Sequence, residues 1–186
     1  MRSSPFLVPV LASALLLVSC GGGASGPRVS SPFTAQDAAV FDNAVDVVSE
    51  PDILEGRWYD DWASDLVGRV TSGDIVMVVN LEAVRHVTTP DGKDSFRLQV
   101  SIDRVLLGDR PADPAFAARE DEAGYDSIAQ NERRILDRPF VAFVKWKQES
   151  NGDVVARWHL SPASNGVLAT VNQAIQHRAR LSSAAQ

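Results

Sequence analysis

The chain has a single cysteine, Cys20, among its 186 residues. One cysteine cannot form a disulfide within the chain, so chemical attachment is a more natural role for it than cross-linking. Basic residues are also few, because 18 Lys and Arg oppose 24 Asp and Glu and the formal net charge is −6. This balance does not supply the basic face that nucleic acids require, and we expect no nucleic-acid partner.

Long apolar runs are absent as well. A membrane-spanning helix takes about 20 apolar residues, and the longest candidate, residues 6–18, falls short of this and is interrupted by Pro9. It follows a short segment that carries Arg2. Its length is that of the apolar region of a secretory signal peptide, roughly 7–15 residues.

The apolar run ends in the tetrad Leu17-Val18-Ser19-Cys20. This N-terminal segment resembles the signal peptide and lipobox of bacterial lipoproteins. The resemblance implies export, cleavage before Cys20, a diacylglyceryl group on the Cys20 sulfur and, usually, a further acyl chain on the new amino terminus. Gly21 rather than Asp follows the cysteine, which resembles the pattern of lipoproteins sent to the outer membrane of two-membraned bacteria. The alternative is an ordinary signal peptide in which Cys20 lies near the cleavage point by chance.

Four segments are predicted along the chain. Residues 1–19 form the signal peptide, and residues 20–32, rich in Gly and Ser, form a lipidated flexible tether. Residues 33–180 form one domain and residues 181–186 a frayed tail. The part after the signal peptide carries a formal charge of −7. We therefore expect the lipid, and not the acidic surface, to hold the protein at the bilayer.

Two helices are predicted at the start of the domain. Thr34 is a candidate N-cap, with Asp37 at the N3 position. The apolar residues that then recur at helical spacing are Phe41, Ala44, Val45 and Val48, and Pro51 ends this helix. The second stripe consists of Trp58, Trp62 and Leu66 and ends near Gly68.

Four strands follow, paired by two turn signals. The runs 74–83 and 96–103 flank Pro90-Asp91-Gly92, and two further runs flank Asn151-Gly152. The remaining predictions are a loop at 108–114, a surface helix within 115–137 that could be broken near Gly124, and a last helix from about Ser164. Hairpins make antiparallel sheets, so the class is α+β. We expect a small curved antiparallel sheet or partly open barrel, with N- and C-terminal helices packed on it.

Catalytic and metal-binding patterns are missing. The three histidines, His86, His159 and His177, are scattered, so the sequence predicts no metal site and no cofactor. No Gly-x-Ser-x-Gly elbow is present to hold a serine nucleophile. Ser161 follows closely after His159, but we expect the two side chains to point to opposite faces of their strand.

Aromatic and acidic residues gather in the second predicted helix. Trp58 and Tyr59 could stack on a sugar ring, and Asp61 and Asp65 place two like charges on one helical face, which suggests a binding surface. The simpler interpretation is that Trp58 and Trp62 belong to the buried stripe, while the aspartates face water.

These patterns predict a membrane-anchored cell-envelope lipoprotein that acts as a binding or interaction module without catalysis. Its partners would be the bilayer, through Cys20, and an envelope protein or glycan. The alternative is an envelope hydrolase that acts on glycan or peptide, with carboxylates near Trp58 and Trp62 as acid and base.

Overall fold

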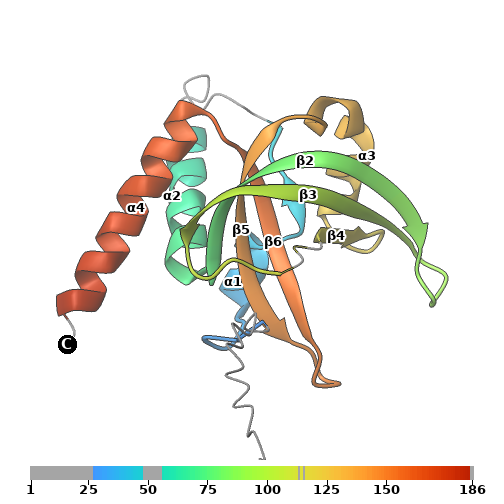
Figure 1. Cartoon of the computed structure of the whole chain (residues 1–186), viewed down its shortest axis with the longest axis horizontal. Coiled ribbons are helices and arrows are strands. Elements are labelled where there is room, and N and C mark those ends of the chain that lie inside the picture. Colours follow the sequence, from blue (N-terminus) through green and yellow to red (C-terminus); the bar gives the residue numbers. More distant parts are fainter. Residues whose placement is uncertain (1–26, 48–55, 113, 115, 185–186) are drawn as a thin grey trace, which may run out of the picture.

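The computed structural model describes residues 27–47, 56–112, 114 and 116–184. In chain order its elements are α1 (Ala35–Val40), β1 (Ala44–Val45), α2 (Arg57–Ser72), β2 (Ile75–Thr88), β3 (Asp94–Leu107), β4 (Phe116–Arg119), α3 (Gly124–Ile135), β5 (Pro139–Gln148), β6 (Val154–Pro162) and α4 (Asn165–Ala184). The strands form one curved sheet, and α2 and α4 lie side by side against it (Figure 1). The fold is α+β with a partly open barrel, as the sequence predicts.

The sheet has the strand order β1-β6-β5-β2-β3-β4. Hairpins join β2 to β3 and β5 to β6, and β2 pairs with β5 antiparallel between the hairpins. Gly92 and Gly152, with φ of 82° and 92°, occupy left-handed turn positions that favour glycine. Only β1 runs parallel to its neighbour, β6, so the sheet is mixed at that edge rather than purely antiparallel.

The central strand β2 is covered on both faces, which explains its nearly continuous apolar sequence. Its inward residues Ile75, Met77 and Val79 join a core inside the curved sheet that includes Trp158. Its outward residue Val76 joins a second core beneath the helices. That outer core also contains Phe41, Leu66 and Val70, the strand residues Val141 and Phe143, and Val167, Val171 and Ala174 of α4.

The two edges of the sheet are bridged by α3, which contacts both β1 and β4. The approach is close at Gly124, where a Cβ atom would lie 1.8 Å from the backbone oxygen of Asn43. Asn43 adopts a φ of 58°, and its Nδ2 donates to Glu122 at 2.9 Å. The helix therefore closes the gap between the edges by direct backbone packing.

Replacing Gly124 with Ala is expected to destabilise the protein by about 1–3 kcal/mol, the usual cost of forced overpacking. The added methyl group would meet backbone and not a movable side chain. Gly68→Ala is the matched control, because its Cβ would meet nothing within 4 Å and Ala is the better helix former. Urea denaturation of both variants checks this, and equal stability of the two would contradict the tight α3 contact.

The prediction of the first helix is correct at its start and wrong at its end. The Thr34–Asp37 capping box is confirmed, but the helix ends at Val40. Asn43 then turns the chain in the left-handed region, and Ala44 and Val45 pair with β6 as a strand. Tertiary pairing thus overrides a helical spacing that was compatible with the local sequence. The predicted end of that helix at Pro51 lies outside the described residues.

Other predicted boundaries also move. The segment 115–137 contains the strand β4 before α3 begins at Gly124, because Phe116 and Ala118 alternate into the inner core. The second helix continues past Gly68 to Ser72. The last helix continues to Ala184, beyond the end that we predicted near Arg180.

Candidate functional site

A cavity of about 640 Å³ opens at the end of the barrel where β2 begins and β3 ends. This volume lies within the roughly 300–1,000 Å³ of small-molecule sites. Residues from the N-terminal segment, β2, the loop after β3, β4, β5 and β6 line it together. They include Pro27, Arg28, Ser30, Asp74, Ile75, Met77, Gly108, Asp109, Arg110, Pro111, Ala112, Pro114, Phe116, Val144, Trp146, Val154 and Ala156.

The inner wall of the cavity is apolar. Ile75, Met77, Phe116 and Val144 are buried in the inner core and also line the cavity. Ala156 and Trp146, paired across β6 and β5, are only partly buried and widen the wall toward solvent. The four core side chains are at most 5% exposed, so they form the floor of the opening, and the half-buried Trp146 and Ala156 contribute more of its apolar surface.

The rim of the cavity is polar and carries both signs of charge. Asp74 accepts a hydrogen bond from the backbone N–H of Trp146 at 2.7 Å and another from the Ser30 hydroxyl. Arg110 donates to the backbone oxygen of Ile102 at 3.1 Å. Arg28 and Asp109 are exposed on the same rim. A ligand would therefore meet charged groups at the entrance and apolar groups inside.

The N-terminal segment is fastened beside this entrance by Lys145. Its Nζ donates to Ser31 Oγ at 2.9 Å and to the Ser72 carbonyl at 2.8 Å, and lies 3.9 Å from Asp37. The hydrogen bonds to the domain start at Ser30, within the segment that we predicted as tether. Both apolar cores lie within residues 33–175, so a chain that starts at Pro27 contains every described core residue.

A second polar cluster, missed by sequence reasoning, surrounds the buried His159 on the outer side of β6. Its Nδ1 lies 2.8 Å from Asp42 Oδ1, and its Nε2 lies 3.1 Å from Asp46 Oδ1. The Nε2 contact is not aligned as a hydrogen bond, so we treat it as an ion pair. Arg69 lies 3.9 Å from Asp46 and donates to the Val40 carbonyl at 2.9 Å.

The charges of this cluster are mutually dependent. Burial opposes ionisation of His159, but the hydrogen bond with Asp42 and the negative charge of Asp46 raise its pKa above the ordinary value. Burial also opposes the carboxylate of Asp46, yet His159, Arg69 and Ser161 hold its pKa at about 2. The result is a buried imidazolium between two carboxylates, which attaches the segment around β1 to β6.

Ser161 belongs to the same cluster, since its hydroxyl donates to Asp46 Oδ2 at 2.7 Å. Our expectation that His159 and Ser161 point to opposite faces is wrong. They are two residues apart on β6, and the period of a strand places such residues on one face. The serine contacts the carboxylate and not the imidazole, so the arrangement differs from that of a serine nucleophile with its base.

The predicted ligand-binding residues lie on the exterior of α2, away from the cavity lining. Trp58 is 71% exposed, so its assignment to the buried stripe is wrong. Tyr59 is exposed and stacks on the half-buried Trp62 with ring centroids 5.9 Å apart. Asp61 pairs with Arg57 at 3.8 Å in solvent, and Asp65 is exposed on the same helix. The true stripe is Trp62, Leu66 and Val70.

The other two histidines lie apart from His159. His86 contacts Tyr125 and Asp94 at the far end of the β2–β3 hairpin, and His177 is exposed on α4. Among the described residues, no group of three or more His, Cys, Asp or Glu side chains is arranged to hold a metal ion. Within the same residues, none of the helices combines the length and the apolar character needed to span a bilayer.

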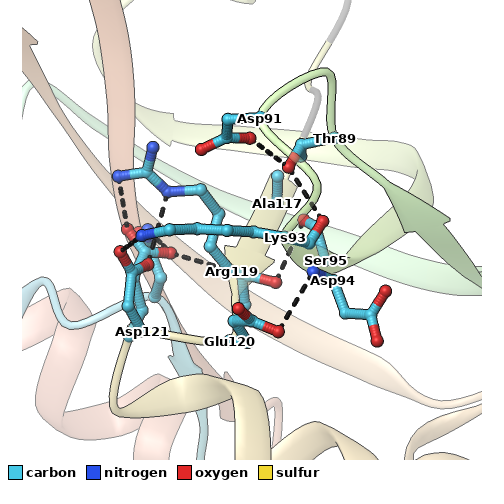
Figure 2. Close-up of polar contacts among 12 residues, drawn as sticks. Thr89, Asp91, Lys93, Asp94, Ser95, Ala117, Arg119, Glu120 and Asp121 are labelled. Carbon is cyan, nitrogen blue, oxygen red and sulfur yellow. Dashed lines mark hydrogen bonds and ion pairs between the residues drawn. The ribbon is translucent and has the colours of Figure 1, made fainter.

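Figure 2 shows a third polar cluster, at the tip of the β2–β3 hairpin. Lys93 pairs with Asp121 at 2.5 Å, and Asp121 also lies 3.6 Å from Arg119. The backbone N–H of Asp94 donates to the carboxylate of Glu120 at 3.2 Å. These residues neutralise one another across β3 and β4, so the cluster fastens the hairpin tip and does not present an open binding group.

Comparison of the chain with protein-family models, with curated proteins and with solved structures finds no match. Of the sites above, the barrel-end cavity is the one with unfilled space and with apolar walls. The two charged clusters are internally satisfied and hold elements together.

Proposed function

We propose that this protein is a membrane-tethered, extracytoplasmic binding module without catalysis, and that its ligand is a small, largely apolar molecule held in the barrel-end cavity. The observation that carries the proposal is the cavity of about 640 Å³, walled by Ile75, Met77 and Phe116 inside a polar rim. Concave, mostly apolar sites with a few polar groups are typical of ligand-binding proteins.

The place of the protein in the cell is part of the same proposal. Cleavage before Cys20 and lipidation of its sulfur would attach the domain to a membrane, and this would be the outer membrane facing the periplasm if the organism has two. One acyl chain gives only marginal binding, but two or more hold effectively permanently, at roughly 0.8 kcal/mol for each buried methylene. Attachment then does not depend on electrostatic attraction between the acidic protein surface and the bilayer.

The hydrolase alternative has less support. The described carboxylates near Trp58 and Trp62 are Asp60, Asp61 and Asp65, which are exposed on α2 and do not line the barrel-end cavity. An exposed helix face offers little exclusion of water around a reacting bond.

The binding proposal can be tested by filling the cavity. We expect N-phenylnaphthylamine to bind to a chain of residues 27–186 with an increase in its fluorescence. Ala156→Phe should weaken this binding about tenfold or more, because the ring would occupy the space of the probe. Val155→Phe is the matched control, since the same change one residue earlier points to the other face of β6.

Circular dichroism of the two variants should match that of the parent, which shows that the loss is local. If the probe does not bind to the parent chain, or if both variants bind it equally, the cavity is not the ligand site.

The anchor predicts a separate result. Cys20→Ser in the full chain should abolish incorporation of an alkyne-tagged fatty acid and move the protein out of the detergent phase into the soluble or uncleaved fraction. Ser3→Ala, within the predicted signal peptide but outside the tetrad, is the control and should change neither. A Cys20→Ser protein that is processed and partitions normally would contradict the lipoprotein assignment.

A further inference from the structure

We infer that the ligand of the barrel-end cavity is an acyl chain of a zwitterionic membrane phospholipid, taken from the bilayer to which the domain is tethered. This inference rests on the proposed function, and it goes further by naming the class and the source of the ligand. It draws on three features: the position of the N-terminal segment, the chemistry of the walls and the charges of the rim.

The position of the tether brings the cavity close to the membrane. Pro27, Arg28 and Ser30 line the cavity, and Cys20 precedes Pro27 by seven residues. A fully extended chain spans at most about 3.3–3.6 Å per residue, so the anchor lies within about 25 Å of the entrance. The hydrogen bonds of Ser30 and Ser31 fix the end of this segment beside the opening. The entrance therefore cannot move far from the bilayer surface.

The walls discriminate between the chemical classes of envelope ligand. A glycan or an extended peptide carries hydroxyl or amide groups along its length, and each such group costs free energy when it is buried without a partner. The inner wall, formed by Ile75, Met77, Phe116 and Val144, presents apolar side chains. An acyl chain needs no hydrogen-bond partners. The interior thus favours hydrocarbon.

The rim suits the headgroup of such a lipid. Arg28 and Arg110 lie at the entrance, and guanidinium groups bind phosphate with favourable geometry. Asp109, beside Arg110, supplies a carboxylate for a headgroup ammonium. Trp146 lines the same opening, and indole rings favour the boundary between polar and apolar surroundings. A rim of mixed charge on an acidic protein favours a zwitterionic headgroup over an anionic one.

Photo-crosslinking in membranes tests the inference with the full, processed chain. Membrane vesicles that contain the protein are supplied with a phosphatidylethanolamine that carries a diazirine in one acyl chain, illuminated and digested for mass spectrometry. We expect adducts on the peptides that contain Ile75–Met77 and Val144–Trp146. Ala156→Phe should reduce these adducts about tenfold, and Val155→Phe should leave them unchanged.

Three results would overturn the inference. The first is adducts confined to the outside of α2 near Trp58, and the second is cavity adducts that persist in Ala156→Phe. The third is displacement of the diazirine phospholipid from the cavity by the acyl chains on Cys20. In each case, binding of N-phenylnaphthylamine by residues 27–186 shows separately whether the cavity is a ligand site at all. If the dye binds but no lipid adducts form, the phospholipid inference is wrong and the proposed binding module stands. If neither the dye nor the lipid binds, the proposed function is wrong as well.

Discussion

Replacing His159 with Ala is expected to lower the free energy of unfolding by about 3–5 kcal/mol, the cost of breaking a buried ion pair by removing one partner. The side chain is buried, and each ring nitrogen faces a carboxylate, Asp42 at 2.8 Å and Asp46 at 3.1 Å. Without the imidazolium, these carboxylates keep only Arg69 as a positive neighbour among their described contacts. The loop that leads from α1 to β1 would keep its backbone pairing with β6 but lose the contact of Asp42 with His159.

The directions of two pKa shifts determine how the stability lost in His159→Ala changes with pH. Because the pKa of His159 is raised in the folded state, its contribution is fully present below the unfolded value of about 6.5 and is lost as the pH rises through the folded value. The pKa of Asp46, lowered to about 2, gives stability above about 3.9 that is lost as the pH falls toward 2. The stability difference between parent and His159→Ala should therefore be largest between about pH 4 and 6.5.

Urea denaturation at pH 5.5 and pH 8.5 measures this difference. His177→Ala is the control, since His177 is exposed and its removal should change stability by no more than about 0.5 kcal/mol. A difference that grows toward pH 8.5 would show that His159 is neutral in the folded protein, and the buried ion-pair description would be wrong.

Trp158→Ala should cost a comparable amount, about 3–5 kcal/mol, as for other large aromatic side chains removed from a core. Trp158 has 0% exposure, and its indole N–H donates to the Ala117 carbonyl at 3.0 Å. Its ring centroid lies 5.3 Å from that of Phe116, so the truncation would leave a cavity beside β4. The same tryptophan connects β6 to the edge strand, and its loss should also loosen the barrel edge.

The matched control is Trp58→Ala, the same change at a residue that is 71% exposed on α2. It should alter stability by no more than about 0.5 kcal/mol. Chemical denaturation of the two variants at one pH decides the outcome. Similar losses of unfolding free energy in the two variants would mean that Trp58 is packed in solution, and the description of Trp58 as exposed on α2 would be wrong.

Local signals explain why most of the sheet could be predicted. The apolar run of β2, the alternation in its hairpin partner β3 and in β5 and β6, and the turn residues around Gly92 and Gly152 are local signals, so both hairpins could be predicted from the sequence. The capping box of Thr34 and Asp37 is local in the same way. By contrast, Ala44 and Val45 become a strand only because β6 lies beside them, and no spacing within the segment shows this.

The functional sites depend on contacts between distant segments, which is why sequence reasoning missed them. Asp42 and Asp46 lie in the segment predicted as the first helix, yet both reach His159, more than one hundred residues later. One signal in the sequence pointed to this cluster. His159 lies on the face of its strand opposite Trp158, and a histidine on a covered face needs polar partners. The cavity had no signal of its own, because the residues that line it come from the N-terminal segment, four strands and the loop after β3 and meet only in the folded chain.

Native mass spectrometry of the full, processed chain released from micelles can detect the lipid anchor and the bound lipid together. We expect the mass of a chain that begins at a lipid-modified Cys20, together with one non-covalent adduct of phospholipid size per chain. The adduct should be lost in Ala156→Phe and kept in Val155→Phe. An unmodified cysteine, or a chain without any adduct whose spectrum is the same in both variants, would contradict a lipid-tethered domain that holds its ligand in the barrel.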